Sequence, residues 1–423
     1  MKESDRKLRV LWFTNSPSCY KPANINYKRN GYNGGGWISA AENAIKNTSK
    51  IDLAISFILD GEPFKNRQGD ITYYPIPNRI KSKQQKILDC IKIILDRNYQ
   101  YEEATWNYYI DHFKRILEDY QPDIIHVWGS ENYFGLVSRI TKKPILLHIQ
   151  GILNSCFNAF LPPSFSWKHF TEKSTLHNIH IRKRYKNACH REENIIKNTN
   201  LLLGRTNWDN HVTRVFNPQS KYYHVDEILR KEFYLNSIRK TPTKLTIISI
   251  ISQPLYKGYD LILKTAKLLS QNIGLEYEWK CYGNISPVFI ENYLGINHND
   301  VNVTLKGIAS PQELKDNLLN ATLYFHPSYI DNSPNSICEA QILGLPVIST
   351  NVGGISSLIE HNVDGFLIPA NDPFQAVYYI KKIYEDLSLN ISMGAKAKAK
   401  AVERHDPEKI TNQILEIYFN INK

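Results

Sequence analysis

Cysteine is scarce in this sequence, and its spacing matches neither a metal site nor a redox pair. Six cysteines occur in 423 residues, scattered without a close pair. They are Cys19, Cys90, Cys156, Cys189, Cys281 and Cys338. We therefore expect reduced thiols in a cytoplasmic protein.

The sequence also lacks three features that would indicate other classes of protein. No two Asp residues stand two positions apart, so the simplest Asp-x-Asp metal clamp is absent and we expect no metal and no other cofactor. No apolar run approaches the roughly 20 residues that a membrane-spanning helix needs. The 26 Tyr are spread along the chain rather than gathered on one platform, so we expect no nucleic-acid partner.

Positive charge is in excess. Lys and Arg number 52 against 41 Asp and Glu, a formal net charge of +11. This excess favours an anionic partner, which charge alone does not identify. The basic stretch IRKRYKNACHRE (181–192) lies in a predicted helix and fits a surface that attracts anionic lipid or a pyrophosphate-linked acceptor. A solvated helix face is the simpler interpretation.

The C-terminal half alternates short apolar strands with amphipathic helices. Such alternation predicts a parallel, doubly wound sheet. Strands are predicted at 244–252, 277–283, 301–307, 321–327, 345–350 and 365–369, and helices over 259–271, 310–319, 334–343 and 355–361. The run KLTIISIIS (244–252) is continuously apolar and β-branched, as expected of a strand buried on both faces.

The N-terminal half has the same pattern with longer insertions. Strands are predicted at 7–14, 51–58, 122–129, 144–151, 199–206 and 221–227, and helices from near Trp37, Ser82, Glu102, Asn132 and His177. We predict an α/β protein of two Rossmann-like, doubly wound domains that face each other across a cleft. The domains span 1–238 and 239–404, and a last helix (405–423) crosses back to the first. Ligands of such sheets lie beyond the carboxyl ends of the strands.

The stretch DNSPNSICEAQILGLPVISTNVGG (331–354) places two carboxylates around a predicted helix start. Ser333 is a good N-cap and Pro334 a good first residue, so free backbone N–H groups and the helix dipole would bind an anion. Glu339 lies roughly 8 Å along the helix, where it can accept both hydroxyls of a ribose. Asp331 lies before the helix and can accept from sugar hydroxyls. Either acid alone is as easily a turn cap or a surface residue, but together they indicate a sugar nucleotide.

This segment resembles the signature of glycosyltransferase family 4, retaining enzymes of the GT-B fold. The family pattern is Glu, seven residues, Glu-Ala, Gly-x-Pro-Val and a Gly-Gly loop. Here it is Asp331, seven residues, Glu339-Ala340, Gly344 to Val347 and Gly353-Gly354. The resemblance implies that the first acid meets the transferred sugar, the second the ribose, and the backbone between them the phosphates. The predicted catalytic acids are thus Asp331 and Glu339, and the donor-binding residues between them are Asn332, Ser333, Asn335 and Ser336.

Other predicted site residues follow strands or open helices. Lys257 matches the family's diphosphate lysine, while the usual upstream Arg is missing and Arg205 or Arg230 would replace it. Gly35 and Gly36 belong to a Gly-rich loop, at a point where the family places one beside the donor phosphate and acceptor. A surface lysine, packing arginines and a plain flexible loop are the alternatives.

A strand end in the first half holds the remaining catalytic candidates. The family often has His-x-His where this chain has His126 and Trp128, so Trp128 replaces the His that usually lines the reaction centre. His126, Glu131 and His148 are possible substitutes for it, although a lone His at a strand end is more often structural.

The function predicted from these features is a retaining, metal-independent hexosyltransferase. The donor is a nucleotide sugar, and the acceptor is a glycan or a polyprenyl-diphosphate-linked glycan. The resemblance suggests capsule, O-antigen or exopolysaccharide synthesis at the inner face of the cytoplasmic membrane, with peripheral contact to anionic lipid. A sugar-nucleotide 2-epimerase of the same fold, a non-catalytic sugar-nucleotide sensor and a nucleic-acid-binding protein are the alternatives. The sequence does not identify the sugar, the base, the linkage or the oligomeric state.

Overall fold

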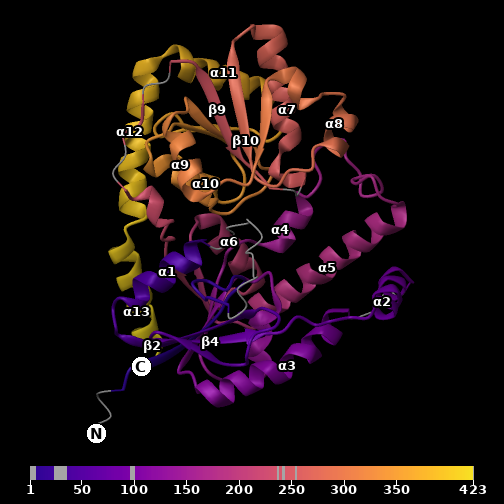
Figure 1. Cartoon of the computed structure of the whole chain (residues 1–423), viewed down its shortest axis with the longest axis vertical. Helices are drawn as coiled ribbons and strands as arrows, with labels where there is room; N and C mark the ends of the chain where they lie inside the picture. Colours follow the sequence, from indigo (N-terminus) through magenta and orange to yellow (C-terminus); the bar gives the residue numbers. More distant parts are fainter. Residues whose placement is uncertain are drawn as a thin grey trace.

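The chain forms two α/β domains, one above the other in Figure 1. The computed structural model describes residues 6–22, 36–95, 101–235, 238–240, 243–252 and 255–422. Each domain is built on a mainly parallel sheet, so the predicted fold class is confirmed. The predicted domain boundaries stay predictions.

The first domain holds an eight-stranded sheet in the described part of the chain, in the order β3-β4-β2-β1-β5-β6-β7-β8. Its strands are β1 Leu8–Phe13, β2 Ile51–Ile58, β3 Asn66–Gln68, β4 Ile71–Ile76, β5 Ile124–Trp128, β6 Ile145–His148, β7 Leu201–Gly204 and β8 Lys221–His224. Its helices are α1 Gly36–Lys46, α2 Lys83–Leu95, α3 Tyr101–Tyr120, α4 Leu153–Asn158, α5 Thr175–Lys197 and α6 Asn207–Phe216. All pairs are parallel except β3 with β4, which are antiparallel at the edge.

The second domain holds a parallel sheet in the order β11-β10-β9-β12-β13-β14. Its strands are β9 Leu245–Ile250, β10 Tyr277–Tyr282, β11 Val303–Gly307, β12 Leu323–His326, β13 Val347–Thr350 and β14 Phe366–Ile368. Its helices are α7 Tyr259–Leu268, α8 Val288–Leu294, α9 Pro311–Leu319, α10 Asn335–Ile342, α11 Pro373–Glu385 and α12 Leu387–Arg404. Ile247 and Ile248 of β9 are both fully buried in separate core clusters, as expected for a strand covered on two faces.

Several local predictions were wrong. The helix predicted over 355–361 is only a 3₁₀ turn, Ile355–Ser357, and the helix predicted from Asn132 is the 3₁₀ segment Tyr133–Arg139. Strands β3 and β4 were not predicted. The first is short and polar, and the second contains Pro75, which normally argues against a strand.

The helix α13 (Pro407–Ile421) returns from the second domain to the first. In Figure 1, α12 and α13 run down one edge of both domains, and α13 lies beside α1. Ile410, Ile414 and Tyr418 belong to a core cluster of the first domain. The Tyr418 hydroxyl accepts a hydrogen bond from Trp12 Nε1 at 3.0 Å. The first domain therefore completes its core with the last helix of the chain.

The chain segment between α4 and α5 makes a second connection, because it leaves the first domain and packs on the second. Phe165 and Phe170, from the first half of the chain, are buried in the core of the second domain. The ring of Phe165 stacks on that of Tyr293 at 4.2 Å, and the Tyr293 hydroxyl donates to the carbonyl of Ser164 at 2.5 Å. These contacts hold the two domains against each other. Among the described residues, no helix is long and apolar enough to cross a bilayer.

Candidate active site

A cavity of about 340 Å³ lies between the two domains. The first domain contributes Gly36, Trp37 and Arg230. The second contributes residues after β9, β10, β11 and β12, together with Pro334, Asn335, Ser336 and Glu339 of the α10 region. The cavity is therefore at the carboxyl ends of the second domain's strands, where doubly wound sheets bind ligands.

The amino end of α10 points into this cavity. The N-cap is Pro334, not the predicted Ser333, and no side chain caps the helix. The first helical hydrogen bonds run from the N–H groups of Ile337 and Cys338 to the Pro334 carbonyl, at 3.0 and 3.4 Å. The N–H groups of Asn335 and Ser336 precede these donors and take no part in the helical hydrogen bonds. Both residues line the cavity, so the helix presents uncapped N–H groups and its positive dipole end to a ligand.

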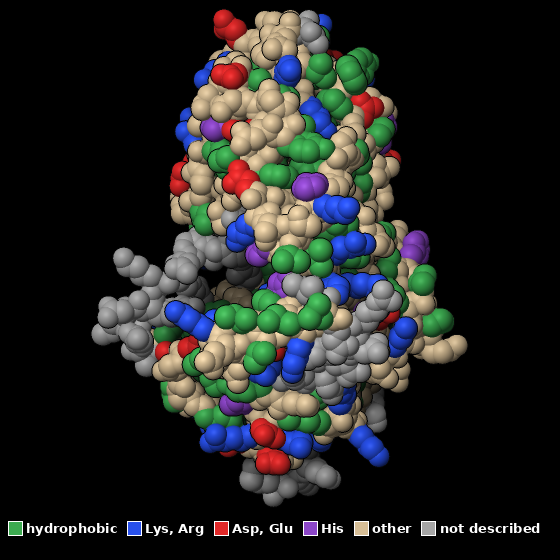
Figure 2. Space-filling view, turned by 90° about the vertical axis from the view of Figure 1, so that its right-hand side faces the viewer, with side chains coloured by type: hydrophobic (Ala, Val, Ile, Leu, Met, Phe, Trp, Pro, Cys, Tyr) green, Lys and Arg blue, Asp and Glu red, His purple; other side chains and the backbone are tan. Residues whose placement is uncertain are grey.

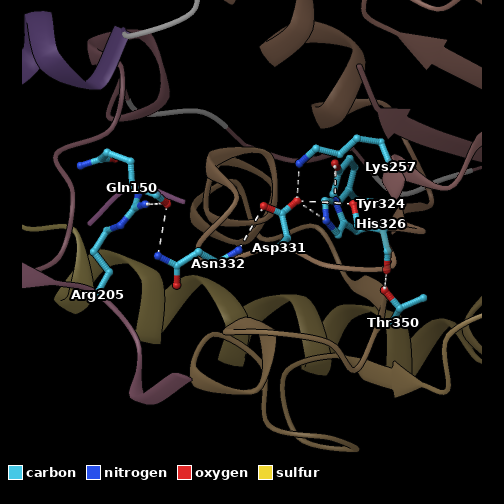
Figure 3. A network of polar contacts seen from close by, with 9 residues as sticks. Gln150, Arg205, Lys257, Tyr324, His326, Asp331, Asn332 and Thr350 are labelled. Atoms are coloured by element: carbon cyan, nitrogen blue, oxygen red, sulfur yellow. Dashed lines mark hydrogen bonds and ion pairs between the residues drawn. The ribbon is translucent and has the colours of Figure 1, made fainter. Parts of the chain in front are cut away.

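Asp331 lies at the cavity in a cluster of hydrogen bonds (Figure 3). Lys257 Nζ lies 2.7 Å from Asp331 Oδ2, and His326 Nε2 lies 3.1 Å from the same oxygen. Burial alone would raise the pKa of Asp331, but the Lys257 ammonium and the His326 hydrogen bond hold this pKa well below its usual value. Burial in turn lowers the pKa of His326, so the imidazole is neutral and donates from Nε2. Asp331 is therefore an anion whose side chain is held in place.

The Gly353-Gly354 pair supports the backbone of the Asp331 loop. Gly353 has φ +54°, and a Cβ there would lie 1.9 Å from the Asp331 carbonyl oxygen. The N–H of Gly354 donates to that same oxygen at 3.0 Å. A side chain at Gly353 would push the acid loop away, which explains physically why the motif has glycine here.

Glu339 forms an ion pair with Arg230 across the cavity. Arg230 Nε and Nη2 donate to Glu339 Oε1 and Oε2, each at 2.6 Å. Glu339 is only 3% exposed, and burial raises its pKa although Arg230 opposes that shift. A carboxylate has about four acceptor positions, so Arg230 occupies two and leaves two for a ligand. A Cβ on Gly36 would meet Cγ and Cδ of Arg230 at 3.0 Å, so the glycine gives Arg230 room.

Arg205 does not line the cavity. It is 5% exposed, forms an ion pair with the buried Glu227 and donates from Nη2 to the Gln150 carbonyl at 2.7 Å. Of the two arginines predicted to replace the family's missing cation, only Arg230 therefore lies at the cavity.

Asn332 and Ser333 also lie outside the cavity lining. The Asn332 amide joins the domains. Its Oδ1 accepts from Thr206 Oγ1 at 2.6 Å, and its Nδ2 donates to Asp209 Oδ2 at 2.9 Å. The same Nδ2 donates to the Gln150 carbonyl at 3.2 Å (Figure 3). This use of the side chain does not fit the predicted donor contact. Gly35 lies outside the described residues.

His126 and Trp128 are buried within the first domain. Their rings stack at 4.4 Å, and Trp128 also packs on His148 at 4.6 Å. The Tyr418 hydroxyl and His126 Nδ1 form a hydrogen bond of 2.5 Å, and burial lowers the pKa of His126 to about 3. None of the three lines the cavity, but Trp37, which does, packs on Trp128 at 5.4 Å. His126 is thus placed to support the cleft wall.

Glu131 follows the same strand and binds the next loop. Its Oε1 accepts from the N–H of Gly151 at 2.7 Å, while its Oε2 has no hydrogen-bond partner among the described residues. Burial raises the pKa of Glu131 to about 7, and Glu192 nearby adds to the shift. It does not line the cavity either.

We expect Glu131→Gln to stabilise the protein above neutral pH. The folded pKa exceeds the usual value of about 4.3, so the stabilisation due to the bound proton is complete at low pH and is lost as pH rises through about 7. Glutamine has no such proton to lose. Urea unfolding should show the variant gaining about 2 kcal/mol over the wild type between about pH 5 and about pH 8. Glu118→Gln, on an exposed position of α3, is the control, and a pH-independent difference would contradict the assignment.

Several cavity residues were not predicted from the sequence. His326 ends β12, Tyr282 ends β10, and Gly283 and Asn284 follow it. The sequence did contain a signal for these residues, because each lies at the carboxyl end of a predicted strand, where doubly wound sheets bind ligands. The contact of Trp37 with the cavity depends on how the two domains meet, which no local pattern indicates.

The two facing Rossmann-like domains and the cavity between them define the GT-B class of fold, and solved structures agree. Sucrose-phosphate synthase from Thermosynechococcus elongatus superimposes with a TM-score of 0.71 at 14% identity, covering 98% of this chain and 99% of that chain. Anabaena HepE in complex with UDP-glucose gives a TM-score of 0.63 at 15% identity, covering 98% and 100%. At these identities the likeness concerns the fold alone.

Sequence comparison adds a partial family match. Residues 230–400, less than half of the chain, match the model of "Glycosyl transferases group 1". The amylovoran biosynthesis glycosyltransferase AmsK of Erwinia amylovora is 26% identical over 180 residues, 41% of this chain and 44% of AmsK. The Escherichia coli UDP-Gal:alpha-D-GlcNAc-diphosphoundecaprenol alpha-1,3-galactosyltransferase is 32% identical over 106 residues, 25% and 27% of the two chains. The matched segments thus span less than half the length of either relative.

Proposed function

We propose that this protein is a retaining, metal-independent glycosyltransferase that moves a hexose from a nucleotide sugar to a glycan or lipid-linked glycan. One observation carries the proposal. A single cavity brings together the uncapped amino end of α10, the Lys257 ammonium and two carboxylates, Asp331 and Glu339. A diphosphate fits the first two groups, and the hydroxyls of a sugar and a ribose fit the two acids.

The cavity residues suit the departure of a nucleoside diphosphate. As the bond from the sugar C1 to the phosphate oxygen breaks, negative charge grows on the diphosphate. The N–H groups of Asn335 and Ser336, the α10 dipole and Lys257 would stabilise that charge without a metal ion. Arg230, at the same cavity, would add a second cation in place of the family's missing arginine.

The proposed attack occurs on the face of the sugar from which the diphosphate leaves. The acceptor oxygen forms the new bond to C1, and its proton can pass to the departing phosphate oxygen on that face. Asp331 would hold the sugar through its hydroxyls, and its low pKa keeps it an acceptor at neutral pH. Closure of the two domains would exclude water that competes with the acceptor.

The relatives support the substrate class. One matched relative acts with UDP-galactose on a diphosphoundecaprenol-linked sugar, another is named for amylovoran biosynthesis, and a capsular polysaccharide glycosyltransferase of Staphylococcus aureus is 28% identical over 129 residues. We therefore propose a place in capsule, O-antigen or exopolysaccharide synthesis, with the growing glycan as acceptor.

A ligand panel followed by product analysis tests the proposal. We expect one member of a set of UDP-, GDP- and ADP-sugars to stabilise the protein, by about 2.7 kcal/mol at a hundredfold excess over Kd, with EDTA present. Mass analysis with glycan and lipid-linked acceptors should then show one added hexose. A released epimer of the donor would favour the 2-epimerase, and stabilisation without turnover would favour a sensor. Stabilisation by no nucleotide sugar, or loss of activity in EDTA, would contradict the proposal.

A further inference from the structure

Asn332 follows Asp331 in the chain, yet its side chain is bound by the first domain. An amide has two N–H donors and one carbonyl acceptor, and all of these groups are used here. Thr206 Oγ1 donates to the amide carbonyl, while the amide nitrogen donates to Asp209 Oδ2 and to the Gln150 carbonyl. The side chain is only 4% exposed. A replacement that lacks these donors and this acceptor would therefore leave buried polar groups unpaired.

The first-domain partners of Asn332 are themselves held in place. Thr206 is the N-cap of α6 and accepts from the N–H of Asp209 at 3.1 Å. Asp209 Oδ2 also accepts from the N–H of Arg205 at 3.0 Å, and Arg205 Nη2 donates to the Gln150 carbonyl at 2.7 Å. These residues follow β6 and β7 or belong to the first turn of α6. The sheet and helix of the first domain thus fix the position of the Asn332 amide.

Asp331 is held from both domains. Within the second domain, Lys257 and His326 both contact its Oδ2. Its other oxygen, Oδ1, accepts from the backbone N–H of Asn332 at 3.2 Å. A Cβ on Gly354 would lie 2.4 Å from the Asn332 carbonyl oxygen, so the chain is tightly packed at this point. The position of Oδ1 therefore depends on Asn332 and, through its amide, on the first domain.

We propose that Asn332 is a positioning residue that makes the orientation of Asp331 depend on contact with the first domain. The inference rests on the proposed function and deepens it, because Asp331 is the acid proposed to hold the transferred sugar. Without the first domain in contact, Asp331 keeps only the bonds that the second domain supplies. The sugar site is thus complete only where the two domains meet, and a nucleotide sugar on the second domain alone is less readily cleaved by water.

Other contacts also join the domains, so loss of the Asn332 contacts need not separate them. Figure 2 shows the upper, second domain lying directly on the lower, first domain on the face in view. The backbone N–H of Asn207 donates to Ser357 Oγ at 3.1 Å, which is an interdomain hydrogen bond that does not involve Asn332. Ser357→Ala therefore provides a matched control, because it removes one hydrogen bond between the same two domains.

Kinetics with matched variants tests the proposal. Asn332→Ala should lower kcat for sugar transfer about 100-fold, the loss that a misplacement of about 1 Å can cause. The Kd of a nucleoside diphosphate, measured by calorimetry, should stay unchanged, because α10 and Lys257 remain in place. Thr206→Ala removes one bond from the first-domain side and should lower kcat about fivefold. Thr206→Ser, which keeps the hydroxyl, and Ser357→Ala should both retain the wild-type kcat.

Hydrogen exchange gives a readout that needs no turnover. Peptides that cover residues 327–333 should exchange faster in Asn332→Ala and in Thr206→Ala than in the wild type or in Ser357→Ala. Faster exchange in these variants, with no transfer by the wild type from any nucleotide sugar, would contradict the transferase proposal and still support the positioning of Asp331. If Asn332→Ala does not fold, the difference between Thr206→Ala and Thr206→Ser decides.

Three results would overturn the inference. The first is unchanged exchange or unchanged kcat in Asn332→Ala. The second is an equal loss of kcat in Ser357→Ala, because any contact between the domains would then have the same effect. The third is a loss of diphosphate affinity as large as the loss of kcat, because Asn332 would then act on donor binding.

Discussion

Asp331→Asn should lower turnover about 100- to 1000-fold while the nucleoside diphosphate still binds. The loss is of the size seen when one preorganised transition-state contact is removed. Asn keeps the size of the side chain but loses the charge that Lys257 and His326 hold in place. The nucleoside diphosphate itself lacks the sugar that Asp331 is proposed to hold, so its Kd should stay the same or fall. Steady-state kinetics and calorimetry with the diphosphate separate the two effects.

The control for Asp331→Asn removes a carboxylate elsewhere in the same domain. Asp372 caps α11 through its side chain, and Asn caps helices about as well as Asp. Asp372→Asn should therefore leave turnover unchanged. The assignment of Asp331 to the sugar would be wrong if Asp331→Asn kept full turnover. It would also be wrong if the variant lost affinity for the diphosphate while its turnover changed little.

Glu339→Ala should weaken binding of the donor at least about 100-fold, because the variant can no longer accept hydrogen bonds from the ribose hydroxyls. Two hydrogen bonds to a charged acceptor are lost, each worth about 1.5–3 kcal/mol. The substitution also leaves Arg230 without its partner, and this structural change contributes to the loss of affinity. Comparing the affinities for a nucleoside diphosphate and for its 2′-deoxy form, within each protein, cancels the structural contribution. The wild type should prefer the ribose form at least about tenfold, and the variant should bind both equally.

Two further variants sharpen this experiment. Glu385→Ala on the exposed side of α11 removes one carboxylate far from the cavity lining and should keep the ribose preference. Arg230→Met leaves Glu339 in place, so it should keep the preference while weakening the diphosphate about tenfold or more. An undiminished preference in Glu339→Ala would show that another group holds the ribose.

The sequence predicted the part of the site that depends on short separations along the chain. Asp331, Asn335, Ser336 and Glu339 reach one cavity because a strand, a turn and a helix follow one another within 20 residues. Lys257 also follows a strand that could be predicted from its β-branched run. In each case the local pattern and the doubly wound sheet are sufficient.

The other contacts depend on how distant segments pack. The pairing of Arg230 with Glu339 joins residues 109 apart, and the Asn332 contact with Thr206 joins residues 126 apart. Sequence reasoning treated Asn332 as a donor ligand because it lies beside Asp331, yet its amide is used between domains. Arg205 was equally plausible as a phosphate ligand until its burial against Glu227 was seen. Patterns in one segment carry no information about such partners.

The return of α13 to the first domain has a consequence for biosynthesis. On the ribosome, the N-terminal sheet emerges long before Tyr418, whose hydroxyl forms hydrogen bonds with Trp12 and His126. Until then, the apolar groove that α13 later fills is open to water or to chaperones. The first domain therefore cannot complete its core until the end of α13 has been translated.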